Sequence, residues 1–133
     1  MKYLVDSDWV IDYLAGRQQA ITLLSSLAKE GLAVSLITLG EFYEGIYYGR
    51  DPQKSEAGFR NFLRGVTVLS LNRSIMQRFG YIRGDLRRKG LLIGDPDILI
   101  AATTMYHDLT LLSRNRKDYE RIQGLKAQFP PNL

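Results

Sequence analysis

The feature that most constrains this chain is a regular alternation between short apolar runs and longer segments with helical periodicity. Four runs of aliphatic or β-branched residues are typical of buried strands, at residues 2–5, 32–36, 66–69 and 109–112. Between these runs, apolar residues recur three and four positions apart, as they do in amphipathic helices. Strands that alternate with helices are joined by right-handed crossovers, and the resulting sheet is covered on both faces. We therefore predict an α/β fold in which a central parallel sheet of four or five strands is flanked by helices on both faces.

Local signals indicate where the helices begin. Ser7 and Asp8 precede the first helix, Thr38 opens the third, and Asn72 caps a long basic helix. The pair Asp95-Pro96 opens the following helix, because proline is favoured at the first helical position. We expect the Pro130-Pro131 tail to be loosely held.

The chain has 133 residues, which is the usual size of one domain, so residues 1–133 are predicted to form a single unit. It contains no cysteine, which excludes disulfides, thiolate zinc sites and a cysteine nucleophile. No apolar run approaches the roughly 20 residues of a membrane span, and no signal peptide is apparent. We expect a cytoplasmic protein with no membrane contact.

Charge is unevenly distributed along the chain. Residues 50–90 contain ten Lys or Arg and three acidic residues, whereas the remainder has eight bases and eleven acids. A basic flank beside an acidic region suits a polyanionic substrate held near a cation site. A solvated helical face explains the same charges equally well.

The acidic and amide side chains fall where the chain leaves the predicted strands. In an open parallel sheet, ligands bind beyond the carboxyl ends of the strands. The polar candidates at these positions are Asp6, Glu41, Asp95, Asp97, Asn115 and Asp118.

Each candidate alone can be explained as a helix cap. Thr38 and Glu41 match a capping box, and Asp95 can be an N-cap. Asp97 would lie in the first turn of its helix, where the helix dipole favours a negative charge. Asp8, Asn115 and Asp118 admit similar explanations. If several carboxylates converge, however, a pair about 4 Å apart repels by roughly 4 kcal/mol at an effective dielectric near 20. An all-oxygen cluster of this kind favours Mg²⁺ or Mn²⁺.

Four ordered motifs resemble those of PIN-domain nucleases, and among them the VapC-type toxins of prokaryotic toxin–antitoxin pairs. The motifs are Val5-Asp6-Ser7-Asp8, the segment Ile37–Gly45, the segment Asp97–Thr103 and the segment Ser113–Tyr119. The resemblance covers essentially the whole chain, and four motifs in order are far more specific than any one of them.

The resemblance implies a metal site and two protein partners. Asp6, Glu41 and Asp97 would bind Mg²⁺ or Mn²⁺, and Asn115 occupies a fourth position where many relatives carry Asp. This neutral residue leaves open whether one or two ions bind. Ser7 and Ser113 would orient water or ligand, while Asp8, Asp95 and Asp118 would support the site. The family also implies a homodimer and a cognate antitoxin that blocks the site.

Several other residues admit simple structural interpretations. Phe42, Tyr43, Tyr47 and Tyr48 are candidates for the antitoxin contact, although core packing is favoured for Phe42. Gly45 is interpreted as a site of close helix packing. His107 is interpreted as a helix C-cap rather than a catalytic base.

Together with the acidic candidates, the resemblance to PIN-domain nucleases implies hydrolysis of an RNA phosphodiester by metal-activated water. Candidates for contacts with backbone phosphates are Arg73, Arg83, Arg87 and Arg88. Two alternatives remain at this point. Asp6-Ser7-Asp8 also fits the D-x-D motif of an aspartate-nucleophile phosphatase, and the basic segment alone permits a non-catalytic RNA-binding or antitoxin-type module.

Overall fold

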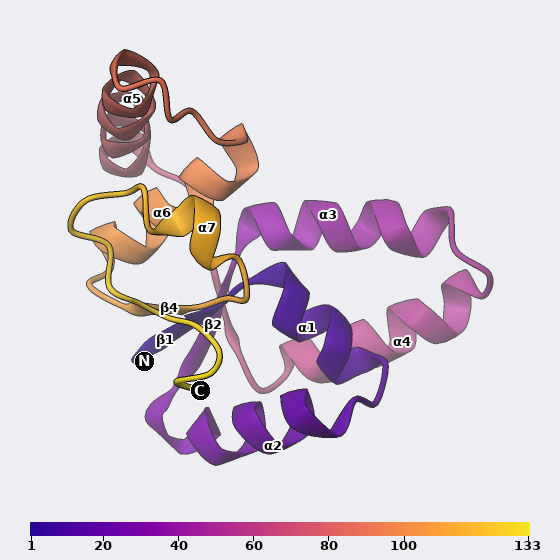
Figure 1. The fold of residues 1–133 in the computed structure, drawn as a ribbon. Coiled ribbons are helices and arrows are strands. Elements are labelled where there is room, and N and C mark those ends of the chain that lie inside the picture. Colours follow the sequence, from indigo (N-terminus) through magenta and orange to yellow (C-terminus); the bar gives the residue numbers. More distant parts are fainter.

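The computed structural model describes all 133 residues and contains one five-stranded parallel sheet (Figure 1). The strands lie in the order β3-β2-β1-β4-β5. They are β1 (Tyr3–Val5), β2 (Leu32–Ser35), β3 (Thr67–Leu69), β4 (Thr110–Leu112) and β5 (Ala127–Gln128). The helices are α1 (Ser7–Leu14), α2 (Gln18–Leu27), α3 (Leu36–Tyr47), α4 (Pro52–Leu63), α5 (Arg73–Arg88), α6 (Asp95–Tyr106) and α7 (Arg116–Tyr119), with a 3-10 turn η1 (Ala28–Glu30) after α2. The predicted α/β architecture is confirmed.

The sheet separates two hydrophobic cores. Side chains alternate across a strand, so Leu4 of β1 lies in one core and Val5 in the other. The first core is formed with α5 and α6 and includes Ile98 and Leu86. The second is formed with α1 to α4 and includes the fully buried Trp9. Burial on both faces explains why the strand segments read as continuous apolar runs. None of the helices combines the length and apolarity needed to cross a bilayer.

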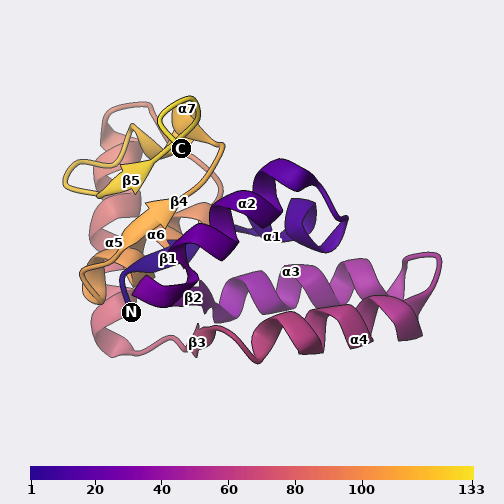
Figure 2. The same cartoon turned by 90° about the horizontal axis from the view of Figure 1, so that it is seen from below.

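Helices α3 and α4 form an antiparallel pair that projects away from the sheet (Figures 1 and 2). Phe42 of α3 stacks on the buried Phe59 of α4, with ring centroids 4.7 Å apart. The packing interpretation of Phe42 is therefore confirmed. The interpretation of Gly45 is wrong, because a Cβ atom at this position would meet nothing within 4 Å.

The observed caps differ from two of the predicted ones. Helix α3 begins at Leu36, and Ser35 Oγ accepts a hydrogen bond from the Ile37 amide, so the predicted start at Thr38 is wrong. Helix α6 is preceded by Gly94 as its N-cap, so Asp95 is not the cap. The cap at Asn72 is confirmed, since its Oδ1 accepts from the Ile75 amide.

At the other end of α6, His107 is the C-cap residue, as predicted. In the first helix the N-cap is Asp6, and Asp8 lies in the first turn instead.

The C-terminal segment is held more firmly than predicted. Residues 127–128 add β5 to the edge of β4, and Phe129 is buried beside them. Arg116 Nη2 donates to the Pro130 carbonyl oxygen at 3.3 Å. The strand β5 has only two residues, too few for a recognisable alternation of apolar side chains.

Candidate active site

Strand order brings three chain segments to one edge of the sheet. Strand β1 lies between β2 and β4, and the three strands are parallel. Asp6 follows β1, Ser113 follows β4, and the helix that follows β2 carries Glu41. The chain builds outward from β1 to β3 and then returns to β4 on the other side. Such a reversal opens a crevice at the carboxyl ends of the strands, where ligands bind in α/β folds.

Asp6 is the central carboxylate of this edge and is 6% exposed. Its Oδ1 accepts from the Ser7 amide and its Oδ2 from the Ser113 hydroxyl, both at 2.8 Å. Burial and the nearby charge of Asp8 raise the pKa of Asp6 to about 7, although these hydrogen bonds favour the charged form. A buried carboxylate with this pKa is unusual outside functional sites.

Asp8 lies beside Asp6 in the first turn of α1. Its Oδ2 accepts from the Arg114 amide at 2.8 Å and from Ser113 Oγ at 3.4 Å. Its Oδ1 accepts from the Trp9 amide at 2.7 Å. Burial raises the pKa of Asp8, and these three donors oppose that effect. Asp8 is therefore anchored to the turn after β4 as well as to its own helix.

Asp97 joins the cluster from the first turn of α6. Its Oδ2 lies 3.4 Å from Nδ2 of Asn115, which also donates to Asp118 at 3.2 Å. Burial raises the pKa of Asp97, and the charges of Asp118, Glu41 and Asp8 raise it further. Asn115 caps α7 by accepting from the Asp118 amide, so the cap interpretation of Asn115 holds together with its place in the site.

Tyr119 was not among the predicted site residues, yet it lies between two of them. Its hydroxyl donates to Asp97 Oδ1 at 3.3 Å, and its ring is almost fully buried. Burial and the charges of Asp6 and Asp97 raise the pKa of the Tyr119 phenol, which therefore remains a neutral donor. Its spacing of four residues from Asn115, within one helical turn, was the available signal.

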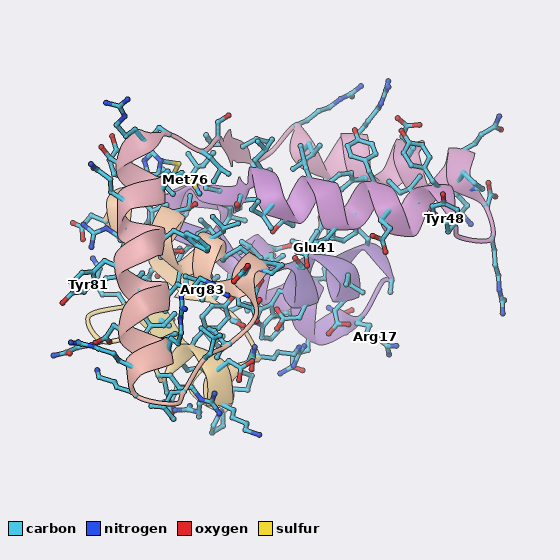
Figure 3. The ribbon with its side chains drawn as sticks, turned by 90° about the horizontal axis from the view of Figure 1, so that it is seen from above. Arg17, Glu41, Tyr48, Met76, Tyr81 and Arg83 are labelled. Carbon is cyan, nitrogen blue, oxygen red and sulfur yellow. The ribbon has the colours of Figure 1, made fainter.

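Glu41 reaches the site from α3 through Ser7. The Ser7 hydroxyl donates to Glu41 Oε1 at 2.8 Å and lies 3.3 Å from Thr38 Oγ1. Because α3 begins before Thr38, Glu41 lies in the second turn and no capping box with Thr38 forms. Glu41 is exposed, and its charge is felt at Asp97. Figure 3 shows Glu41 near the middle of the view, on α3.

The donor set is chemically suited to a hard divalent cation. It consists of carboxylate, hydroxyl and amide oxygens, and three carboxyl groups in it have raised pKa values. Burial is the main cause of these raised values, and a bound cation would offset the cost of burying the charged carboxylates. With the side chains as they lie in this structure, no three Asp, Glu, His or Cys residues are placed so that they could hold one metal ion together. The carboxylates instead accept hydrogen bonds from the serines, Asn115 and Tyr119.

Asp95 does not share the carboxylate cluster. It forms an ion pair with Arg83 of α5, in which Nε donates to Oδ1 at 2.8 Å. Arg83 points inward from α5, whereas Tyr81 on the same helix points away (Figure 3). The other predicted phosphate contacts lie at the two ends of α5, where Arg73 begins the helix and Arg87 and Arg88 end it.

A cleft of about 810 Å³ opens beside the acidic cluster, between α1, α3 and α4. Its lining includes Ser7 and Glu41, apolar side chains such as Ile11, Phe42 and Ile46, and the polar Lys54 and Ser55 of α4. Ile11 is 54% exposed. Two residues of the candidate site therefore share a cleft with several apolar side chains.

Comparison with known proteins gives concordant results. The model of the PIN domain family matches residues 3–125. Ribonuclease VapC2 of Haemophilus influenzae is 31% identical over 128 residues, which cover 96% of this chain and 97% of that protein. The tRNA(fMet)-specific endonuclease VapC of Salmonella typhimurium is 26% identical over the same shares of the two chains. Among solved structures, a similar chain occurs in the crystal structure of VapBC2 from Rickettsia felis bound to a DNA fragment from its promoter. That chain aligns with a TM-score of 0.91 and 25% sequence identity, and the alignment covers 97% of this chain and 98% of that chain.

Proposed function

Because the chain belongs to the PIN domain family and is similar to VapC ribonucleases along almost its whole length, we propose that it is a metal-dependent endoribonuclease, the toxin of a toxin–antitoxin pair. The observation that carries this proposal is the meeting of Asp6, Asp8 and Asp97 at the carboxyl edge of the sheet, each with a raised pKa. Buried carboxyl groups with raised pKa values are costly to a fold, and a cation-dependent reaction with a phosphodiester accounts for them.

We expect Asp6, Glu41 and Asp97 to hold the cation, with Asn115 at the fourth position. A bound Mg²⁺ or Mn²⁺ ion supplies an activated water and stabilises negative charge on the phosphate. Because Asn115 contributes an amide where a carboxylate would add charge, we expect one ion rather than two.

The remaining polar residues position these ligands. Ser113 and the Ser7 amide hold Asp6 by two hydrogen bonds, and Ser7 Oγ holds Glu41. Tyr119 donates to Asp97, leaving the other oxygen of that carboxylate to Asn115. Asp118 restrains the Asn115 amide. Partners of this kind fix the orientation of metal ligands and are needed for affinity.

Arg83 is the strongest candidate for a contact with the RNA backbone. Its Nε is engaged by Asp95, two positions before Asp97 at the start of α6. Fixing the guanidinium through Nε leaves its two terminal amino groups to bind a phosphate in a bidentate manner. Asp95 is thus a positioning residue for Arg83, which is a different role from that of an N-cap.

A cognate antitoxin would block the site from the apolar cleft. The cleft is lined by Ile11 and Phe42 as well as by Ser7 and Glu41, so an apolar segment lying in it would cover Glu41. We expect that segment to end in a basic side chain that faces Glu41. We also expect a homodimer, as the resemblance to VapC proteins implies.

The decisive experiment is cleavage of RNA by the purified chain. We expect Mg²⁺ or Mn²⁺ to support endonucleolytic cleavage of tRNA, EDTA to stop it, and Asp97→Asn to abolish it while leaving the circular dichroism spectrum unchanged. The tRNA(fMet) named for the Salmonella relative is the first substrate to test. Undiminished cleavage by the Asp97→Asn variant would overturn the assignment. A trapped phospho-aspartate at Asp6, or RNA retention without cleavage, would favour a phosphatase or a binding module instead.

A further inference from the structure

The turn between β4 and α7 contacts three carboxylates of the site within three residues. The Ser113 hydroxyl donates to Asp6, the Arg114 amide donates to Asp8, and the Asn115 amide group donates to Asp97. The Asn115 backbone amide also donates to Ser113 Oγ at 3.0 Å. The position of this turn therefore determines the positions of the acidic groups.

The Arg114 side chain holds the turn against α1. Its guanidinium carbon lies 3.8 Å from the centroid of the Trp9 ring, and its Nη2 is 2.9 Å from Asp12 Oδ2. Asp12 is restrained in turn by Arg17, at 3.4 Å. Trp9 is completely buried, so the ring that receives the guanidinium is fixed by the core. We call Trp9, Asp12 and Arg114 the arginine clamp.

Both sides of the arginine clamp adjoin the same carboxylate. Trp9 follows Asp8 directly, and its amide donates to Asp8 Oδ1. On the opposite side, the Arg114 amide donates to Asp8 Oδ2. Loss of the Arg114 side chain would free the turn, and the donors to Asp8 and Asp6 would move with it.

This arrangement is costly unless it has a role. Arg114 Nε and Trp9 Nε1 are both buried and have no hydrogen-bond partner. Buried donors without partners destabilise a fold and call for an explanation. Maintaining the geometry of the acidic site is such an explanation.

We propose that Arg114, through the arginine clamp, is a positioning residue that sets the affinity of the acidic site for its divalent cation while contacting neither the cation nor its ligand oxygens. This inference rests on the proposed metal site. This role differs from a purely electrostatic one. The positive charge of the Arg114 guanidinium near the site would by itself weaken the binding of a divalent cation, whereas the clamp strengthens that binding by ordering the ligands.

The test is Mn²⁺ binding to the full chain, measured by calorimetry and by the emission of Trp9, which is the only tryptophan. We expect Arg114→Met to weaken Mn²⁺ binding by about 10- to 100-fold, as loss of partners of metal ligands does. Arg114→Lys retains the charge but lacks the planar group that stacks, so it should fall between Arg114→Met and the parent. At saturating Mn²⁺ the Arg114→Met variant should regain its kcat on RNA with an unchanged KM.

The matched control is Arg116→Met. Arg116 lies over the Phe129 ring at 5.0 Å and pairs with Glu120 at 2.8 Å, so it also combines aromatic stacking with an ion pair. It donates no hydrogen bond to the acidic cluster. We expect its Mn²⁺ affinity to equal that of the parent chain.

The outcomes separate this inference from the proposed function. If the parent chain binds Mn²⁺ and a folded Arg114→Met variant binds it equally well, the clamp proposal is overturned and the metal site stands. If Arg114→Met does not fold, the charge-conserving Arg114→Lys variant decides: weaker Mn²⁺ binding supports the proposal, and unchanged binding overturns it. If the parent chain binds no Mn²⁺, both proposals fail.

Discussion

Ser113 donates a hydrogen bond to Asp6 across 107 positions of the sequence, with Oγ and Oδ2 only 2.8 Å apart. The two residues follow the neighbouring parallel strands β4 and β1, and the Asp6 amide continues the ladder to the Leu112 carbonyl oxygen at 2.9 Å. This pair connects the two ends of the chain at the centre of the candidate site.

Removing the hydroxyl should change the pH dependence of cleavage. The Ser113 hydrogen bond favours the charged form of Asp6, so its loss in Ser113→Ala should raise the pKa of Asp6 further. Protons then compete more strongly with the cation at neutral pH. We expect cleavage to fall at least several-fold at pH 7 and to recover near pH 8.5, with a stability loss of about 1 kcal/mol. The exposed Ser26→Ala variant, which loses only a bond to the Leu23 carbonyl oxygen, is the control.

The metal-free protein should become less stable as the pH rises from about 4 to about 7. The pKa of Asp6 is 3.8 in a model compound and about 7 in the fold, so the folded state binds the proton more tightly. Protonation therefore stabilises the fold at low pH, and that stabilisation disappears as the pH passes through the folded value. Thermal unfolding in EDTA should show this fall, and Asp6→Asn should reduce it. A Tm in EDTA that rises over this range would contradict the assignment.

Added Mn²⁺ should act in the opposite direction. Because the cation binds the charged carboxylates of the native state, it should raise the Tm more at pH 8 than at pH 5. The same measurement on Asp97→Asn should show a much smaller increase. An equal increase in Tm for both proteins would indicate that Mn²⁺ binds elsewhere.

Arg83→Met should weaken RNA binding more than it slows the chemical step. Loss of one phosphate contact should raise KM by about 10-fold. It should also reduce the slope of the logarithm of the binding constant against the logarithm of salt concentration by about one. Asp95→Asn should give a smaller change in the same direction, since it only frees the guanidinium. Arg88→Met is the matched control, because Arg88 pairs with Asp85 on the exposed end of α5. Equal effects at both arginines would indicate that α5 acts only through its general charge.

Ile11→Asp should separate inhibition from catalysis. Ile11 lines the apolar cleft and is more than half exposed, so a carboxylate there should be tolerated by the fold. We expect at least a 30-fold loss of antitoxin affinity with unchanged RNA cleavage in the absence of antitoxin, since a buried unpaired charge costs about 2 kcal/mol or more. Isothermal titration with the cognate antitoxin measures this difference. Tyr81 of α5 is 78% exposed and does not line the cleft, so Tyr81→Asp is the control (Figure 3).

Local patterns predicted the architecture well because each strand and helix has its own signal. The alternation of apolar runs and helical periods gave the parallel sheet, and Asn72 and His107 cap their helices as expected. The start of α3 was misplaced because Ser35 and Thr38 are both good caps, and only the end of β2 decides between them.

The site depended on contacts that no local pattern contains. The sequence motifs predicted Asp6, Asp97 and Asn115, and the fold brings them together. The role of Tyr119 and the stacking of Arg114 on Trp9 arise from residues far apart in the chain that meet only after the sheet has formed. The ion pair between Arg83 and Asp95 likewise forms only because α5 packs beside α6.

The position of β1 at the centre of the sheet has a consequence for synthesis of the protein. Asp6 leaves the ribosome well before its partner strand β4 and the Ser113–Asn115 turn, which follow it by more than a hundred positions. A nascent or prematurely terminated chain therefore carries its first carboxylate without the donors that order it. The acidic site can therefore become ordered only after the chain has been made as far as this turn.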